Sequence, residues 1–443
     1  MSSTRFGHPT GLFYLAFTEA WERFSFYGMS SLLVLYMVNQ LLLPGHAEHI
    51  AGFMSFRSGI ESIFGPLSTQ ALASQVYGLY AGFVYFTPLL GGMVADRWIG
   101  QRNAVIVGAL SMTGGHIAMA FDRSFLLALT LLVVGSGFLK GNISAQVGAL
   151  YPRDDESRRT RGFSIFSMSI NFGAVAGPLL CGWLAQRYGW DRGFGVAAIF
   201  MMAGLATYLV GYRHLPARVQ RTATESATLT PADWRIIRTL LLVLFISIFQ
   251  SLAYFQCTNV FPVFAQEHVA PTVAGLQIPI PWYQSLDPMF SIVGVPVLFA
   301  LWRYQAARQR EPGDLGKIGV GAAIVCAGNL ILAAATLSAG GAPINPIWPL
   351  LYFACMGIGF LFYWPTLLAL VSRTAPAKVN ATMMGVAFMS LFVANNLIGW
   401  IGGFYERVGP VGFWTLHAAI SVTGTLLVLV FGRSITRALQ PTA

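Results

Sequence analysis

The stretch Glu19-Ala-Trp-Glu22-Arg23-Phe-Ser-Phe-Tyr-Gly28 lies inside an apolar segment, residues 11–43, that is long enough to cross a lipid bilayer. A charged side chain at the bilayer centre costs at least ~2.5–3.5 kcal/mol, so three of them in one turn require a polar interior and mutual neutralisation. The spacings i, i+3 and i+4 place Glu19, Glu22 and Arg23 on one face of a helix. We predict a functional cluster in a membrane protein, with a purely structural buried ion pair as the alternative.

The composition is that of a polytopic membrane protein. The chain has 443 residues, of which 55% are hydrophobic and 10% are charged, whereas soluble domains carry about 25% charged residues. The net charge of +10 is expected to lie in cytoplasmic loops, as the positive-inside rule requires, so no nucleic acid is needed as a partner. The four cysteines fall in apolar segments, and their spacing fits no metal site and no disulfide framework.

Twelve apolar segments are long enough to span a bilayer, and they predict an all-α membrane protein with a bundle of six plus six transmembrane helices. Their approximate limits are 11–43, 72–95, 103–121, 125–150, 162–186, 194–212, 236–266, 283–302, 318–338, 347–372, 381–405 and 411–431. The loops rich in arginine and lysine all fall on one side when both termini are cytoplasmic. We expect a multi-pass protein of the bacterial inner membrane with this orientation.

The chain is expected to contain two related halves. The longest polar stretch separates them, which gives an N-terminal bundle (1–213), a cytoplasmic linker (214–234) and a C-terminal bundle (235–443). A weak repeat supports this division, because Gly182-Trp-Leu-Ala-Gln-Arg-Tyr-Gly in the fifth segment resembles Gly402-Gly-Phe-Tyr-Glu-Arg-Val-Gly in the eleventh. Paired repeats are typical of membrane transporters.

A short motif, Gly91-Gly-Met-Val-Ala-Asp96-Arg97-Trp-Ile-Gly-Gln-Arg102, follows the second segment. A run of glycine, aspartate and arginine in a short cytoplasmic loop resembles the signature of the major facilitator superfamily. Its glycines permit close helix packing, and Asp96 can cap a helix or pair with an arginine. We predict that Asp96 and Arg97 belong to a cytoplasmic gate, with an ordinary positive-inside loop as the alternative.

Lys140 is the only lysine that the sequence places inside a helix. A buried lysine needs a carboxylate partner or loses its proton, and Glu19 and Glu22 are the natural candidates. Two carboxylates that share Arg23 and Lys140 allow a proton to change the pairing, because protonation of one glutamate frees a cation. These four residues are therefore predicted to form a proton-coupling group.

The motif that begins at Glu19 resembles the E-x-x-E-R-F-x-Y-Y-G motif of the proton-dependent oligopeptide transporter family. Four further stretches resemble the same family: Val84-Tyr-Phe-Thr-Pro-Leu-Leu-Gly-Gly, Gly135-Ser-Gly-Phe-Leu-Lys140-Gly-Asn-Ile-Ser, Phe163-Ser-Ile-Phe-Ser-Met-Ser-Ile-Asn171 and Trp282-Tyr-Gln-Ser-Leu-Asp287-Pro. The resemblance implies a proton-driven symporter of short peptides. It implies the same proton-coupling residues, and a substrate cavity lined by Tyr27, Tyr80 and Asn171.

The second half departs from the family pattern where substrate contacts are expected. The departures are at Gln256, Asp287, Phe360 and Ala387, and the neighbouring Gln284 and Ser390 are predicted to bind substrate with them. Phe360 stands where the family has a glutamate that receives the amino terminus of the peptide, and Asp287 stands where it has an asparagine. We hypothesise that Asp287 takes over recognition of a cationic group, or shares in proton coupling. A protonated structural residue, or one bonded to a local arginine, is the alternative.

The predicted function is proton-coupled symport of di- or tripeptides, or of peptide-like solutes, by alternating access. The alternative is a proton-coupled importer or exporter of a non-peptide, bulkier amino compound. An enzyme is not indicated, because the sequence offers no pair of nucleophile and base, no cluster of metal ligands and no phosphate loop. We expect a monomer in the lipid bilayer that binds a small-molecule substrate and protons and needs no cofactor.

Overall fold

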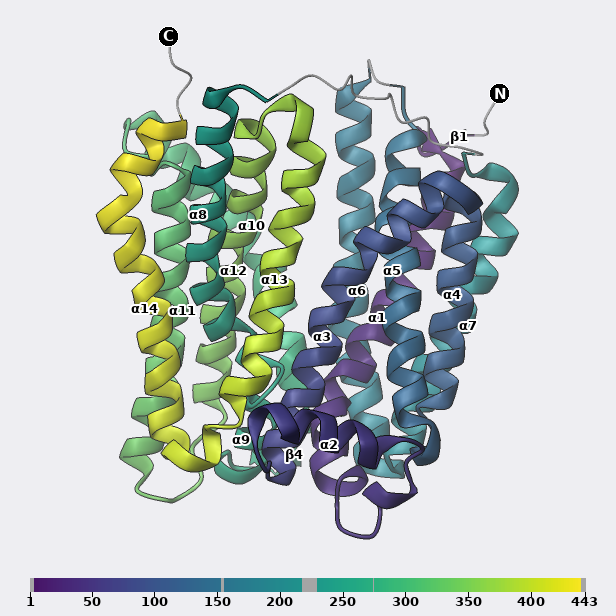
Figure 1. Ribbon diagram of the computed structural model, residues 1–443, viewed down its shortest axis with the longest axis vertical. Helices are drawn as coiled ribbons and strands as arrows, with labels where there is room; N and C mark the ends of the chain where they lie inside the picture. The colour runs from purple at the N-terminus through teal and green to yellow at the C-terminus, as the bar shows by residue number, and fades with distance from the viewer. Residues whose placement is uncertain (1–3, 153–154, 217–228, 274, 440–443) are drawn as a thin grey trace. The chain divides into compact units, whose positions relative to one another are not determined.

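Long helices make up most of the protein, and the computed structural model describes residues 4–152, 155–216, 229–273 and 275–439 (Figure 1). In these residues the long helices are α1 (Thr10–Tyr36), α3 (Thr69–Val94), α4 (Gly100–Ala118), α5 (Phe125–Ala149), α6 (Glu156–Tyr188), α7 (Trp190–Gly211), α8 (Pro231–Tyr254), α10 (Trp282–Ala307), α11 (Asp314–Ala339), α12 (Ile347–Thr374), α13 (Asn380–Gly402) and α14 (Tyr405–Leu439). Ten regions of the described chain are long and apolar enough to cross a membrane; one holds both α3 and α4, and α1 is not among them. The predicted fold of twelve membrane helices is confirmed.

Short elements connect the long helices. Besides several 3₁₀ and π-helical turns, the described residues include the short helices α2 (Phe53–Phe64) and α9 (Phe261–His268) and the antiparallel hairpin β3–β4 (Thr272–Val273 with Leu276–Gln277). A second hairpin, β1–β2 (Thr4–Arg5 with His8–Pro9), precedes α1. The segment 236–266 was expected as one span, but α8 ends at Tyr254 and a 3₁₀ turn separates it from α9. Pro262 lies in the first turn of α9, where a missing N–H is tolerated although a continuous helix would be broken.

Capping residues determine where several helices begin. Ser68 Oγ accepts a hydrogen bond from the Ala71 N–H at the start of α3, and Thr230 and Asp233 form a capping box at the start of α8. Such contacts satisfy N–H groups that have no partner within the helix. α11 begins at Asp314, so Lys317 lies in its first turn. Lys140 is therefore not the only lysine inside a helix, contrary to the expectation from the sequence.

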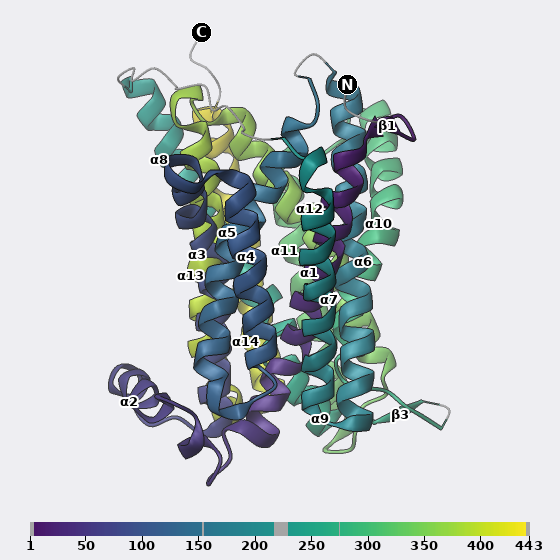
Figure 2. The ribbon, with the colours of Figure 1, turned by 90° about the vertical axis from the view of Figure 1, so that its right-hand side faces the viewer.

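The first of two compact units comprises Met1–Ala73, Phe83–Arg221 and Pro279–Ser285. Within it α1 packs against α6 and α7, and the three helices lie side by side in Figure 2. The contact is close because a Cβ atom at Gly173 of α6 would lie 2.6 Å from the Ala20 carbonyl oxygen of α1. Small residues permit this packing in membranes, where exclusion of water does not drive helices together. It holds the charged turn of α1 against α6.

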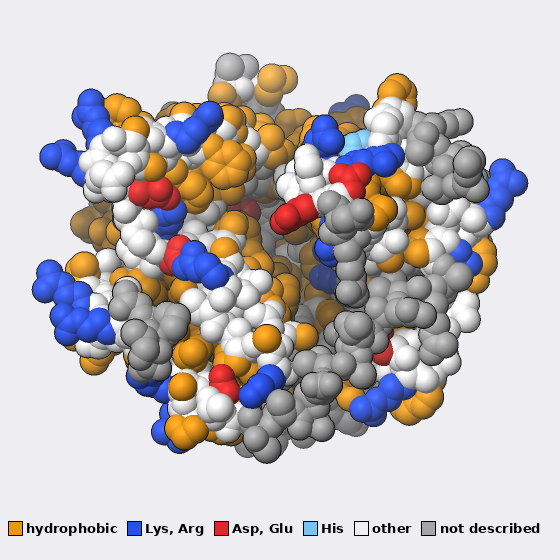
Figure 3. Space-filling model, turned by 90° about the horizontal axis from the view of Figure 1, so that it is seen from above, with side chains coloured by type: hydrophobic (Ala, Val, Ile, Leu, Met, Phe, Trp, Pro, Cys, Tyr) orange, Lys and Arg blue, Asp and Glu red, His pale blue; other side chains and the backbone are white. Residues whose placement is uncertain are grey.

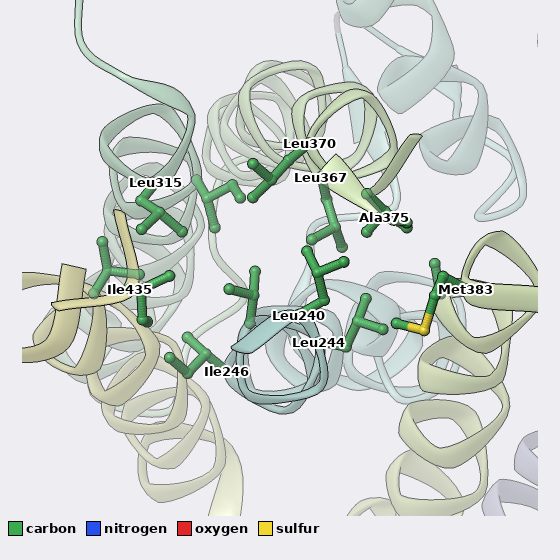
Figure 4. Packing of buried hydrophobic residues seen from close by; sticks show 14 of the residues in the cluster. Leu240, Leu244, Ile246, Leu315, Leu367, Leu370, Ala375, Met383 and Ile435 are labelled. Atoms are coloured by element: carbon green, nitrogen blue, oxygen red, sulfur yellow. The ribbon is translucent and has the colours of Figure 1, made fainter. Parts of the chain in front are cut away.

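The second unit comprises Ser74–Gly82, Thr222–Ile278 and Leu286–Ala443. Side chains from α8, α11, α12, α13 and α14 form its buried hydrophobic cluster (Figure 4), which includes Leu240, Leu244, Leu315, Leu367, Leu370 and Ile435. Leu240 and Leu367 are fully buried. Because lipid tails are as apolar as leucine, dispersion contacts and close packing stabilise this cluster more than burial from water does.

The two units are not continuous along the chain. The middle of α3 belongs to the second unit, and the first turn of α10 belongs to the first. The predicted bundles, 1–213 and 235–443, are unbroken along the chain and do not include this exchange of segments. Residues 217–228 of the predicted linker lie outside the described residues, and the domain boundaries stay a prediction.

Candidate functional site

Arg23 joins two carboxylates on one turn of α1. Its Nε atom lies 3.1 Å from Glu19 Oε1, and its Nη2 atom donates a hydrogen bond of 2.7 Å to Glu22 Oε1. Nε also forms an ion pair with Glu22 Oε2. All three side chains are buried. The helical spacing explains this arrangement, because residue i+4 returns to the same face and its neighbour i+3 lies beside it.

Lys140 of α5 supplies a second cation to this group. It interacts electrostatically with Glu19, Glu22 and Arg23, and with it the four ionised side chains sum to zero charge. Its ammonium nitrogen stands over the Phe26 ring, 4.5 Å from the centroid, and the Arg23 guanidinium also lies over that ring, at 5.3 Å. Within the described chain no ion pair joins Lys140 to a carboxylate, so the expected pairing is replaced by a cation–π contact.

One carboxylate oxygen of the cluster is available for a proton. Glu19 Oε2 is buried and has no hydrogen-bond partner among the residues that the structure describes, whereas both oxygens of Glu22 contact Arg23. A buried unsatisfied acceptor costs about 1–3 kcal/mol, more for a charged group. Protonation at Glu19 would remove that cost and weaken the Arg23–Glu19 pair.

A second group lies in the other unit, around Asp287 of α10. The Tyr254 hydroxyl of α8 donates a hydrogen bond of 2.7 Å to Asp287 Oδ2, and the Tyr254 ring stacks on Phe360 of α12, with centroids 5.2 Å apart. Asp287 Oδ1 is buried without a hydrogen-bond partner, and no arginine or lysine pairs with this carboxylate, in the described part of the chain. The group therefore combines an unpaired carboxyl oxygen with a stacked pair of aromatic rings.

The sequence did not identify Tyr254 as a partner of Asp287, and it did not identify Phe26 as a cation–π partner of Lys140 and Arg23. A tyrosine or phenylalanine in an apolar helix carries no signal that separates a functional ring from ordinary packing. The only signal for Phe26 is its place inside the Glu19 motif. The contact of Tyr254 with Asp287 and that of Phe26 with Lys140 each join two different helices. Spacing along one helix could therefore not reveal them.

Gln256 has its amide group engaged by hydrogen bonds. Its Nε2 atom donates to the Ile398 carbonyl oxygen at 3.3 Å, and its Oε1 atom accepts a bond of 3.1 Å from Asn259 Nδ2. Ala387 belongs to the buried hydrophobic cluster, and the Ser390 hydroxyl donates to its carbonyl oxygen at 2.6 Å. These side chains thus fix helices in place, and their substrate contacts stay a prediction.

The other predicted residues are distributed over both units. Tyr27, Asn171 and Gln284 are half-buried in the first unit, and Tyr80 is buried in the second. Asp96 is half-buried and Arg97 is exposed in the π-helical turn that follows α3. The structure thus brings together the four residues of unit 1 that the sequence predicts to couple protons, and separately Asp287 with Phe360. Among the described residues no group of three metal-ligating side chains could hold a metal ion.

Three comparisons with known proteins agree with one another. Residues 23–399 match the sequence pattern of a family described as the Major Facilitator Superfamily. The chain is 29% identical to a peptide transporter of Yersinia enterocolitica, over 96% of this chain and 94% of that one. It is 28% identical to an uncharacterised transporter of Bacillus subtilis, over 98% and 96%. It also resembles the crystal structure of a peptide transporter, POT, in complex with alafosfalin, with a TM-score of 0.86, 26% identity and coverage of 99% and 98%.

Proposed function

The chain belongs to the major facilitator superfamily, and on that premise we propose that it is a proton-coupled symporter of di- and tripeptides or peptide-like solutes. The recognition of the proton-dependent oligopeptide transporter family from the sequence is confirmed. The protein is thus a multi-pass membrane transporter, for which alternating access is the expected mechanism. The comparisons do not favour the alternative cargo, a non-peptide amino compound.

The buried Arg23 cluster carries this proposal. With both glutamates ionised, Arg23 and Lys140 balance their charge inside the bundle. Protonation of one glutamate leaves an uncompensated cation, and an unpaired charge of this kind costs about 3–5 kcal/mol. A cation–π contact such as that of Lys140 with Phe26 recovers only about 0.5–2 kcal/mol. The remainder, about 1–4.5 kcal/mol, is smaller than the ~5.5 kcal/mol that reverses a two-state population completely. It still shifts the equilibrium between two conformations by about 5-fold to about 2000-fold, so one proton biases the conformation.

Recognition of the peptide would use the group around Asp287. Its available oxygen can accept hydrogen bonds from an ammonium group, and the faces of Tyr254 and Phe360 attract the same cation. This arrangement would compensate for Phe360 at the position where the family has a glutamate. We assign Tyr27, Tyr80 and Asn171 to the walls that contact the rest of the substrate, and Asp96 and Arg97 to the cytoplasmic gate.

The location of the protein and its partners follow from the same proposed function. We place the protein as a monomer in a bacterial inner membrane with both termini in the cytoplasm, since the loops rich in arginine and lysine are then cytoplasmic. Its partners are then a small peptide-like molecule, protons and the bilayer lipids. Transport of this kind needs no cofactor and no enzymatic step.

Uptake into proteoliposomes tests the proposed function directly. The purified protein is reconstituted, and accumulation of a radiolabelled dipeptide is followed with and without an inwardly directed proton gradient. One pH unit is worth about 1.36 kcal/mol, so one proton per peptide supports about tenfold accumulation, which a protonophore abolishes. Peptide uptake that is equal with and without the proton gradient would overturn the proposal. So would a complete absence of peptide uptake and of competition by unlabelled peptides.

A further inference from the structure

A cavity of about 1160 Å³ opens at one end of the second unit. The first turn of α11, the last turns of α12 and α14, and Ile236 of α8 line it. One part of the wall is basic and includes Arg373, Arg433 and Arg437, whereas another part is apolar and includes Leu429 and Val430. The proton-coupling and substrate groups described above do not contribute to this cavity.

The charge in the cavity is unbalanced. Its only acidic lining residue, Asp314, forms an ion pair with Arg373. Arg433 and Arg437 are four residues apart on α14, so they lie on one face of the helix. Both are exposed, and neither forms an ion pair in the part of the chain that the structure describes. Two adjacent guanidinium groups offer the fork of donors that suits a phosphate oxyanion.

The apolar part of the wall faces outward from the bundle. Leu429 is 71% exposed and Val430 is 68% exposed, in a helix long and apolar enough to cross the membrane. Such surface contacts acyl chains. Because Arg433 follows Leu429 by one helical turn, a surface for acyl chains continues directly into a surface for an anion. The first turn of α11, whose N-cap Gly313 provides no side-chain cap, adds backbone N–H donors to the same cavity.

We propose that this cavity binds the headgroup of an anionic phospholipid, with its phosphate at Arg433 and Arg437 and its acyl chains along Leu429 and Val430. Basic cavities between membrane helices on the cytoplasmic side recognise such headgroups. The cavity lies at the end of the unit that we place in the cytoplasm, and Figure 3 shows Lys and Arg side chains in several groups around this end of the molecule. A lipid satisfies both parts of the wall, whereas free phosphate satisfies only the basic part.

Lipid-dependent thermal stability tests this proposal. The full-length protein in neutral detergent is titrated with phosphatidylglycerol, with phosphatidylcholine and with inorganic phosphate. The test variant is Arg433→Gln/Arg437→Gln. The control is Arg308→Gln/Arg310→Gln, which removes two exposed arginines of the same unit that do not line the cavity. Because basic side chains near an anionic headgroup contribute to its binding, the test variant should need at least about tenfold more phosphatidylglycerol for half-maximal stabilisation.

The expected result is that phosphatidylglycerol, and neither phosphatidylcholine nor phosphate, stabilises the native protein and the control variant. Without lipid, the melting temperature of the test variant should equal that of the native protein. An equal response of the two double variants would contradict the assignment to this cavity. Full stabilisation by inorganic phosphate, or by phosphatidylcholine, would contradict an anionic lipid as the ligand. Native mass spectrometry of the retained lipids gives a second readout, in which the test variant alone should lose bound phosphatidylglycerol.

Discussion

Phe26 gives the charged cluster of α1 a property that charge counting alone would miss. Arg23 and Lys140 both stand over its ring, so either cation keeps an aromatic partner when a glutamate is protonated. The contact of Glu19 with Arg23 could be predicted from the helical spacing i, i+4. The position of Lys140 over Phe26 could not, because it depends on how α5 packs beside α1.

Replacement of Asp287 by asparagine should weaken the binding of peptides with a free amino terminus. The asparagine oxygen can still accept the Tyr254 hydrogen bond, but the negative charge is lost. A hydrogen bond to a charged group contributes about 1.5–3 kcal/mol, so KM in proteoliposome uptake should rise about tenfold or more.

Tyr254→Phe is the matched control for that variant. It removes the hydroxyl that donates to Asp287 but keeps the carboxylate and the ring that stacks on Phe360. Its effect on KM should be clearly smaller than that of Asp287→Asn. If Asp287→Asn leaves both uptake and its pH dependence unchanged, Asp287 recognises no cation and takes no part in proton coupling.

Among the structural elements, the contact between α1 and α6 depends on Gly173. A Cβ atom there would meet the backbone of α1 at Ala20 and Phe24. Overpacking costs about 1–3 kcal/mol, which offsets the ~1 kcal/mol that alanine gains over glycine in a helix. Gly173→Ala should therefore lower the melting temperature of the purified protein. Gly141→Ala, where nothing in the described chain lies within 4 Å of the added Cβ, should not, and an equal melting temperature for both variants would contradict the close contact.

The hairpin β1–β2 should loosen in acid because of His8. The His8 ring shares a hydrogen bond of 2.8 Å with the Tyr151 hydroxyl. Burial, with the nearby guanidinium groups of Arg158 and Arg161, lowers the pKa of His8 from its usual 6.5. A depressed pKa means that the contribution of His8 to stability is present above pH 6.5 and is lost as the pH falls through the folded-state pKa.

Amide hydrogen exchange of residues 6–8 measures this effect, since Pro9 has no amide hydrogen. After correction for the intrinsic exchange rate, protection of the native hairpin should fall below pH 6.5. In the His8→Gln variant the glutamine can still form a hydrogen bond with Tyr151, but its side chain does not titrate. Protection of the hairpin in this variant should therefore be independent of pH. The same loss of protection in both proteins would show that another group titrates.

The elements that the sequence did not predict share a physical cause. The existence of twelve long helices follows from apolar segments of bilayer length, but that signal does not show where a helix breaks inside such a segment. The 3₁₀ turn between α8 and α9 includes Gln256 and is followed by Thr258 and Asn259, but isolated polar residues also occur within continuous membrane helices. The predicted segment 318–338 begins after the true start of α11 at Asp314. Lys317 in this first turn pairs with Glu311 and lies over the Trp302 ring, contacts that an apolar pattern does not show.

For the whole molecule, the sequence predicted two halves more easily than the exchange of segments between them. A polar linker is visible as composition, whereas the membership of Ser74–Gly82 in the second unit depends on contacts such as that of Asn259 Nδ2 with Ser74 Oγ, at 2.7 Å. The same limit applies to the candidate site. Motif residues locate the charged cluster of α1, but Tyr254 beside Asp287 is a contact between helices that the sequence does not encode locally.

Transport by the Glu22→Gln variant tests the central claim, proton coupling by the Arg23 cluster, most directly. The substitution keeps the shape of the side chain but removes the charge that both Arg23 contacts require. In proteoliposomes the variant should lose accumulation of dipeptide driven by a proton gradient, while exchange of labelled for unlabelled dipeptide continues at a rate close to that of the native protein. Full gradient-driven accumulation by the Glu22→Gln variant would contradict the account.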